Sequence, residues 1–303
     1  YKRQTIDSIK PSSDIIKTSP DTVRLTNSGP VIGIEGEEGI HKWLGIPYAD
    51  PPIEKLRWKA PRNVSSWDKV YEATSFASPC VQIQSSLTGA GLAKPGDIVG
   101  NEDCLYLNIY APAYKINSVP NENNKLPVMV WIHGGGNTSG MTSEYNPQKL
   151  VASQNVIVVT ISYRLGIFGW FSHPELRNRS NGLDASANFG LLDQIKALEW
   201  LRNNIENFGG DKNNITIFGE SAGGQNVIAL YVSPIAKGLF HRAISQSGGI
   251  TLTSIADAED IDRVVFPLKG NYKYRHKTTK AFINNLLNKG IINTHLNETG
   301  NIE

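Results

Sequence analysis

The chain lacks both a marked excess of one charge and any long apolar run. Its 303 residues include 30 lysines and arginines against 28 aspartates and glutamates, a net charge of +2. That balance gives no reason to expect nucleic acid or an anionic membrane as a partner. No apolar run approaches the ~20 residues that a membrane-spanning helix requires. We therefore expect a soluble chain with neither a nucleic-acid nor a membrane partner.

Metal-binding and phosphate-binding patterns are absent as well. Histidine, cysteine and aspartate residues do not occur at the spacings typical of metal sites, and the glycine runs lack the context of a phosphate-binding loop. We therefore expect no metal and no organic cofactor. There is no internal repeat and no low-complexity tract, and with 40% hydrophobic residues the chain can bury a large core.

The chain does contain a serine between two glycines, in the pattern Gly219-x-Ser221-x-Gly223. Residues 214–218, which are largely β-branched or aromatic, predict a strand before this pattern, and residues 222–231 predict a helix after it. A nucleophile elbow is such a turn, so sharp that side chains at the flanking positions would collide with neighbouring backbone. It holds the serine in a strained conformation at a helix N-terminus. We predict Ser221 as a catalytic nucleophile, and the alternative is a plain strand-to-helix turn.

A second glycine motif lies earlier, where a strand expected at residues 126–132 leads into three consecutive glycines. Such glycines expose backbone N–H groups, and each pre-aimed donor stabilises the oxygen of a tetrahedral intermediate by about 2.7–4 kcal/mol. We assign this oxyanion hole to Gly135, Gly136 and Ala222, and the alternative is a flexible glycine loop. His133 precedes the glycines on the same loop, so we interpret it as a shaping residue rather than as a base.

Other segments alternate between strand and helix patterns, as in a doubly wound α/β sheet. Residues 156–161 form a continuous apolar run, typical of a strand buried on both faces. Residues 31–35 and 40–44 flank a turn of glycine and glutamate, which predicts an N-terminal hairpin. Apolar residues at helical spacing predict a helix that packs one face on the sheet: Leu191, Ile195, Leu198, Leu201 and Ile205.

Three segments, residues 45–52, 102–112 and 208–224, resemble the type-B carboxylesterase/lipase family, the α/β-hydrolases that include the cholinesterases and the non-catalytic neuroligins. The resemblance extends from about Val31 to Gly249. It implies an α/β-hydrolase fold, with a central, mostly parallel sheet flanked by helices and an N-terminal β-hairpin. It also implies a carboxylic ester hydrolase that forms an acyl-enzyme on its serine and needs no cofactor.

The resemblance also gives roles to residues around Ser221. Glu220 resembles the acidic residue that borders the active-site gorge, although a solvated turn residue fits as well. Ser247 resembles a serine that hydrogen-bonds the triad carboxylate, although an ordinary strand-end hydroxyl fits equally. Asn137 stands where cholinesterases have an aromatic residue, which implies a different acyl pocket. The family's triad runs serine, acid, histidine along the chain, which also excludes His133 as the base.

Two ion pairs and a disulfide are implied in the same way. The two pairs, which we interpret as structural, are Arg57 with Glu102 and Arg164 with Asp193. Cys80 and Cys104 fall where the family closes its first disulfide loop, which would stabilise the fold by roughly 3.5 kcal/mol. A persistent disulfide implies a secreted or periplasmic protein, and the alternative is two reduced core thiols in a cytosolic enzyme. No tryptophan lies between them, so we expect no special affinity for choline esters.

We expect residues 1–303 to be the N-terminal part of a single catalytic domain, with 1–17 poorly ordered. Residues 250–303 begin the region after the nucleophile and are expected to be partly irregular, with a helix at 278–288. The histidines that follow the nucleophile stand in the wrong context for the base: His241, His276 and His295. A C-terminal part, on the same polypeptide or as a separate chain, is therefore expected to supply the acid, the histidine and several sheet strands. This chain alone would have an incomplete sheet and be inactive.

Two other classes of function stay open at this point. A neuroligin-like adhesion module would need no nucleophile, and the intact Ser221 with its glycine loop argues against it. An inactive fragment that serves only as a binding scaffold is the second. The substrate expected for the hydrolase is a small-molecule carboxylic ester.

Overall fold

A computed structural model describes residues 18–85, 93–249, 252, 254, 255 and 258. The expectations for residues 1–17, for the helix at 278–288, and for His276 and His295 lie outside these residues. The helices are α1 (Gln148–Gln154), α2 (Gly166–Gly169), α3 (Pro174–Asn178), α4 (Phe189–Asn204) and α5 (Ala222–Val232). The strands are β1 (Arg24–Thr26), β2 (Gly29–Ile32), β3 (Ile34–Glu35), β4 (Ile40–Pro47), β5 (Tyr71–Glu72), β6 (Gln82–Ile83), β7 (Ile98–Val99), β8 (Tyr106–Pro112), β9 (Leu126–Ile132), β10 (Ile157–Ile161), β11 (Gly210–Glu220) and β12 (Arg242–Gln246).

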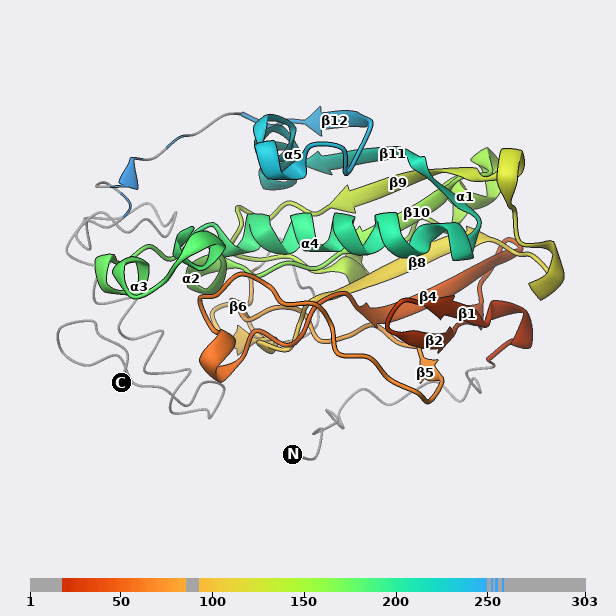
Figure 1. The fold of residues 1–303 in the computed structure, drawn as a ribbon, viewed down its shortest axis with the longest axis horizontal. Helices are drawn as coiled ribbons and strands as arrows, with labels where there is room; N and C mark the ends of the chain where they lie inside the picture. The colour runs from red at the N-terminus through yellow and green to blue at the C-terminus, as the bar shows by residue number, and fades with distance from the viewer. Residues whose placement is uncertain (1–17, 86–92, 250–251, 253, 256–257, 259–303) are drawn as a thin grey trace.

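A seven-stranded sheet in the order β12-β11-β9-β10-β8-β4-β3 runs through the molecule (Figure 1). One half of the sheet consists of β12, β11, β9 and β10, and neighbouring strands in this half are parallel. The connections within it carry α1, α4 and α5, because a parallel pair needs a long crossover. Pairing is antiparallel between β10, β8, β4 and β3. The sheet is thus mixed, and its parallel half is the one that carries Ser221.

The two faces of the sheet contact different apolar layers. All five residues of β10 are buried, as the continuous apolar run predicts. Val159 belongs to the larger core cluster, which contains the buried residues of α4, whereas Val158 packs with Val151 of α1. The ribbon shows α4 lying along one face of the sheet (Figure 1). No helix within the described ranges combines the length and apolarity needed to cross a bilayer.

The N-terminal hairpin differs from the prediction in where its first strand lies. Residues 31–35 do not form one strand, because β2 pairs with β1 and β5 in a separate three-stranded sheet. Only β3 pairs antiparallel with β4. The division falls at Gly33, whose N–H and carbonyl both hydrogen-bond the Thr22 hydroxyl at 2.9 Å. This hydroxyl takes the place of a ladder partner, so the strand is interrupted there.

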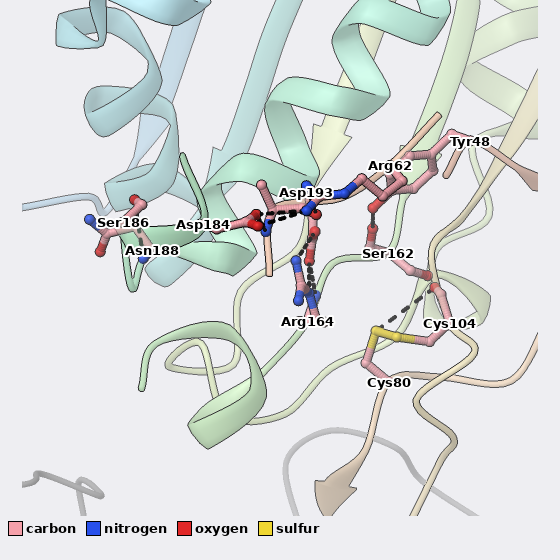
Figure 2. Close-up of polar contacts among 11 residues, drawn as sticks. Tyr48, Arg62, Cys80, Cys104, Ser162, Arg164, Asp184, Ser186, Asn188 and Asp193 are labelled. Atoms are coloured by element: carbon pink, nitrogen blue, oxygen red, sulfur yellow. Dashed lines mark hydrogen bonds and ion pairs between the residues drawn. A yellow bond between two sulfur atoms is a disulfide. The ribbon is translucent and has the colours of Figure 1, made fainter. Parts of the chain in front are cut away.

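The predicted helix at residues 191–205 is α4, and it is anchored by a buried ion pair (Figure 2). The Arg164 side chain donates from Nε and Nη2 to the two carboxylate oxygens of Asp193 at 2.8 and 2.7 Å. The Arg164 backbone N–H donates to the same carboxylate at 3.0 Å. Because Arg164 follows β10, this pair fixes the end of that strand to α4.

A second buried ion pair and the disulfide lie close to each other in sequence. Arg57 donates from Nε and Nη2 to the Glu102 carboxylate at 2.6 and 2.8 Å. Burial raises the pKa of Glu102, an effect larger than the opposing one of Arg57. Cys80 and Cys104 form a disulfide, as Figure 2 shows. The segment around residues 102–104 is therefore held both by charge and by a covalent bond.

Replacing Asp193 by Asn should destabilise the fold strongly. The change leaves a buried Arg164 charge without its counter-charge, so the free energy of unfolding should fall by about 3–5 kcal/mol. Glu199→Gln is the matched control, because it breaks the half-exposed Lys196–Glu199 pair on the same helix and should cost at most about 1 kcal/mol. Urea titrations followed by circular dichroism measure both values. Equal losses for the two variants would contradict the assignment.

Candidate active site

Ser221 lies at the junction between β11, which ends at Glu220, and α5, which begins at Ala222. Its backbone has φ 56° and ψ −122°, a combination that is strained for a residue with a side chain. The strain is held in place by a hydrogen bond of 2.9 Å from the Ser221 N–H to the Gln246 carbonyl on β12. The partly exposed serine stands at the N-terminus of a helix, where developing negative charge is favoured.

The two glycines that flank Ser221 pack directly against the end of β9. A Cβ atom placed on Gly223 would lie 2.1 Å from the Ile132 carbonyl oxygen, and one on Gly219 would lie 2.6 Å from it. Real side chains do not tolerate such distances, so only glycine permits this approach. The close contact brings the turn around Ser221 beside the segment that follows β9.

That segment, residues 134–139, is called the oxyanion loop below. Gly135 and Gly136 have φ of 94° and 65°. The Gly135 carbonyl oxygen accepts hydrogen bonds from the N–H groups of Thr138 and Ser139 at 3.1 and 3.0 Å. This carbonyl therefore points toward the interior of the loop. Within the described part of the chain, the N–H groups of Gly135, Gly136 and Ala222 donate to no other residue. These donors are therefore free to bind an anionic oxygen.

The oxyanion loop begins in contact with Ser221. A Cβ atom placed on Gly134 would lie 3.3 Å from Cβ of Ser221 and 3.3 Å from a carboxylate oxygen of Glu220. Glu220 is exposed beside this loop, and Ser247 is exposed just after β12 with φ 53°. The structure thus brings Glu220 and Ser221 together with the loop.

His133 is buried and packs within the base of the same loop. Its Nδ1 lies 2.9 Å from the Gly134 carbonyl oxygen, which can only accept, so Nδ1 carries the proton and donates. Its ring stacks on Tyr163 with centroids 4.4 Å apart. Burial lowers the pKa of His133 to about 4. The imidazole is therefore neutral at pH 7 and supports the loop.

Asn137 follows the glycines in a left-handed conformation, with φ 56°. Its carbonyl accepts the Gly166 N–H at 2.7 Å. Its side-chain oxygen accepts a hydrogen bond of 2.8 Å from Nδ2 of Asn226 on α5. Asn226 is not among the residues expected from the sequence. The available signal is its polarity at helical spacing from the apolar Leu230, but its partner lies 89 residues away in the chain.

His241 lies far from Ser221. Its N–H donates to the Ile215 carbonyl at 2.8 Å, and its Nδ1 accepts the Ile215 N–H at 3.2 Å. Ile215 precedes Ser221 by six residues along β11, and a strand rises ~3.3 Å per residue, so about 20 Å separate them. No cluster of three His, Cys, Asp or Glu side chains suited to a metal ion occurs in the ranges that the structure describes.

The comparison with known families agrees with this geometry. The model of the carboxylesterase family matches residues 20–291. The chain belongs to the carboxylesterase family. The type-B carboxylesterase resemblance expected from the sequence is therefore confirmed.

Individual members of the carboxylesterase family match the chain over only part of their own length. Cocaine esterase of Homo sapiens is 42% identical over 254 residues, which cover 80% of this chain and 43% of that protein. Para-nitrobenzyl esterase of Bacillus subtilis is 48% identical over 225 residues, which cover 74% of this chain and 43% of that protein. The chain thus spans less than half the length of these curated relatives.

Solved structures of the family confirm the α/β-hydrolase fold. A thermophilic PNB esterase superposes with a TM-score of 0.71 and 39% identity, covering 89% of this chain and 54% of that chain. A carboxylesterase of Geobacillus stearothermophilus gives a TM-score of 0.61 and 40% identity over 74% of this chain and 43% of that chain.

The buried imidazole of His133 should make stability depend on pH. Its folded-state pKa of about 4 lies below the ordinary value of 6.5, so between these values the unfolded chain binds a proton that the folded chain does not. Stability is therefore lost as pH falls from about 6.5 toward 4, and at pH 5 the loss is about 2 kcal/mol.

Urea titrations at pH 7.5 and pH 5 measure this dependence. The variant His133→Asn should be less stable at both values, because it loses the stacking on Tyr163, but the fall between the two should be smaller by about 2 kcal/mol. An unchanged fall in the variant would show that His133 is not the group that titrates.

Proposed function

We propose that this chain contributes the nucleophile and the oxyanion hole of a serine carboxylesterase. The observation that carries the proposal is the strained Ser221 at the N-terminus of α5, packed against a loop of glycines with free N–H groups. Membership of the carboxylesterase family supports ester hydrolysis as the reaction. An adhesion module would require neither the strain nor the free donors.

In the proposed reaction, Oγ of Ser221 attacks the ester carbonyl carbon while a histidine accepts its proton. The carbonyl oxygen becomes an oxyanion and accepts hydrogen bonds from Gly135, Gly136 and Ala222. Collapse of this intermediate breaks the ester C–O bond, and the alcohol leaves with the proton from the histidine. Water then attacks the carbonyl carbon of the acyl-serine while the histidine accepts a proton from the water. Collapse of this second intermediate breaks the bond to Oγ, which releases the carboxylic acid and returns the proton to Ser221.

The histidine and the acid that orients it are proposed to come from a C-terminal part of the protein. Of the histidines considered, His133 is buried and neutral, and His241 lies about 20 Å from Ser221 along a strand. Among the residues that the structure describes, β12 forms one edge of the sheet and all five of its residues are exposed, Ile244 among them, which supports the same proposal. Strands from the C-terminal part would cover this edge, which otherwise presents unpaired backbone groups.

The proposed substrate is a small-molecule carboxylic ester. The relatives' names refer to cocaine and to para-nitrobenzyl esters, which are small esters. Asn137 gives the oxyanion loop a polar side chain where cholinesterases have an aromatic one, and we propose an acyl pocket different from theirs. The Cys80–Cys104 disulfide supports a secreted or periplasmic location, because such bonds persist in oxidising compartments.

Hydrolysis of a para-nitrophenyl ester by the protein, purified with any chain that accompanies it, tests this function. Ser221→Ala should lower kcat by at least about 10⁴-fold, as loss of a nucleophile does in other serine hydrolases. Ser233→Ala is the matched control at the opposite end of α5 and should leave kcat unchanged. Equal activity of Ser221→Ala and the unmodified protein would contradict the proposal.

A further inference from the structure

The side chain of Asn226 links α5 to the oxyanion loop. We infer that Asn226, through its amide pair with Asn137, is a positioning residue that sets where the loop's N–H donors stand relative to Ser221. This inference rests on the proposed function and adds to it a residue that touches neither the substrate nor the reacting atoms. It concerns two of the elements that build the site, α5 and the oxyanion loop.

The two amides face each other and exchange hydrogen bonds. Nδ2 of Asn226 donates to Oδ1 of Asn137 at 2.8 Å, and Nδ2 of Asn137 lies 3.4 Å from Oδ1 of Asn226. A single bond would let the loop rotate about the contact, whereas a reciprocal pair between planar groups restricts both distance and orientation. Asn226 is only 4% exposed, so water offers little competition for its partners.

The oxyanion loop needs such support because Gly136 has little packing of its own. A Cβ atom placed on Gly136 would meet only the Thr138 hydroxyl, at 3.6 Å, and Gly136 is exposed. Its backbone direction is therefore set largely by its neighbours in the chain. Asn137, the next residue, is held on two sides, by the Gly166 N–H on its carbonyl and by Asn226 on its side chain. Fixing Asn137 thus fixes Gly136.

Tyr163 lies near this pair and bonds the base of the loop. Burial raises the pKa of the Tyr163 hydroxyl, and the Asn226 amide is close enough to oppose this larger effect by lowering it. The Tyr163 hydroxyl donates to the His133 carbonyl at 2.6 Å. The Asn226 amide therefore bonds the loop beyond its glycines, at Asn137, and lies near the tyrosine that bonds its start. A buried polar side chain is costly unless it is hydrogen-bonded, and Asn137 supplies that partner.

Kinetics of the purified protein, with any accompanying chain, test the inference. Asn226→Ala and Asn137→Ala should each lower kcat by about 10- to 100-fold, because a small misplacement of catalytic groups is enough for such losses. KM should change by less than about twofold, since the substrate's ground state does not need the oxyanion donors. The inhibition constant of an aryl trifluoromethyl ketone, which forms a tetrahedral adduct with serine, should rise in parallel with the loss of kcat.

The double variant distinguishes a coupled pair from two separate effects. If the two amides act as one unit, Asn137→Ala/Asn226→Ala should be no slower than the worse single variant. The matched control is Asn108→Ala. Asn108 is equally buried and bonds Thr160 at 2.9 Å, but it lies on β8, which β10 and β9 separate from β11. The Asn108→Ala variant should be less stable, while its kcat per folded molecule stays unchanged.

Three results separate failure of this inference from failure of the proposed function. An active protein in which Asn226→Ala keeps its kcat and its affinity for the ketone, as Asn108→Ala does, would overturn the positioning role alone. Full additivity of the two single variants would overturn the coupling between the amides. An unmodified protein that hydrolyses no ester would overturn the proposed function, and the positioning role with it.

Discussion

The candidate site depends on the close backbone contact between the end of β9 and the turn around Ser221. At this contact the Ile132 carbonyl lies where a side chain on Gly219 or Gly223 would have to be. The approach places side by side two segments that are far apart in sequence. One carries Ser221 with its strained backbone, and the other carries the glycines with free N–H groups. The proposed hydrolysis needs both segments, so the proposed site depends on the contact between them.

The surrounding structure holds this contact through buried polar interactions rather than through apolar packing alone. Asp193 on α4 fixes Arg164, and two residues later the Gly166 N–H binds the Asn137 carbonyl in the oxyanion loop. Breaking one buried partner of such a set leaves an unpaired charge or amide, which costs more than the bond itself contributes. The scaffold therefore favours one arrangement of the loop and penalises others.

Local patterns in the sequence predict much of this fold and part of the candidate site. The strand predicted at residues 126–132 is β9 with the same bounds, because an apolar run ending in glycines marks both its extent and its end. The N-terminal hairpin is present as β3 and β4, but its first strand is not continuous over residues 31–35, since the Thr22 hydroxyl that interrupts it comes from another segment. The pairing of Asn137 with Asn226 is not predictable, because no periodicity connects residues 89 positions apart.

Reaction with a fluorophosphonate, followed by mass-spectrometric mapping of the labelled peptide, decides whether Ser221 is the nucleophile. We expect the assembled protein to be labelled at Ser221, and this chain alone, without a general base, to react at least about 10³-fold more slowly. No labelling of the assembled protein, or labelling at another serine, would contradict the assignment of the nucleophile. Equally fast labelling of the isolated chain would contradict the claim that it holds only part of the site.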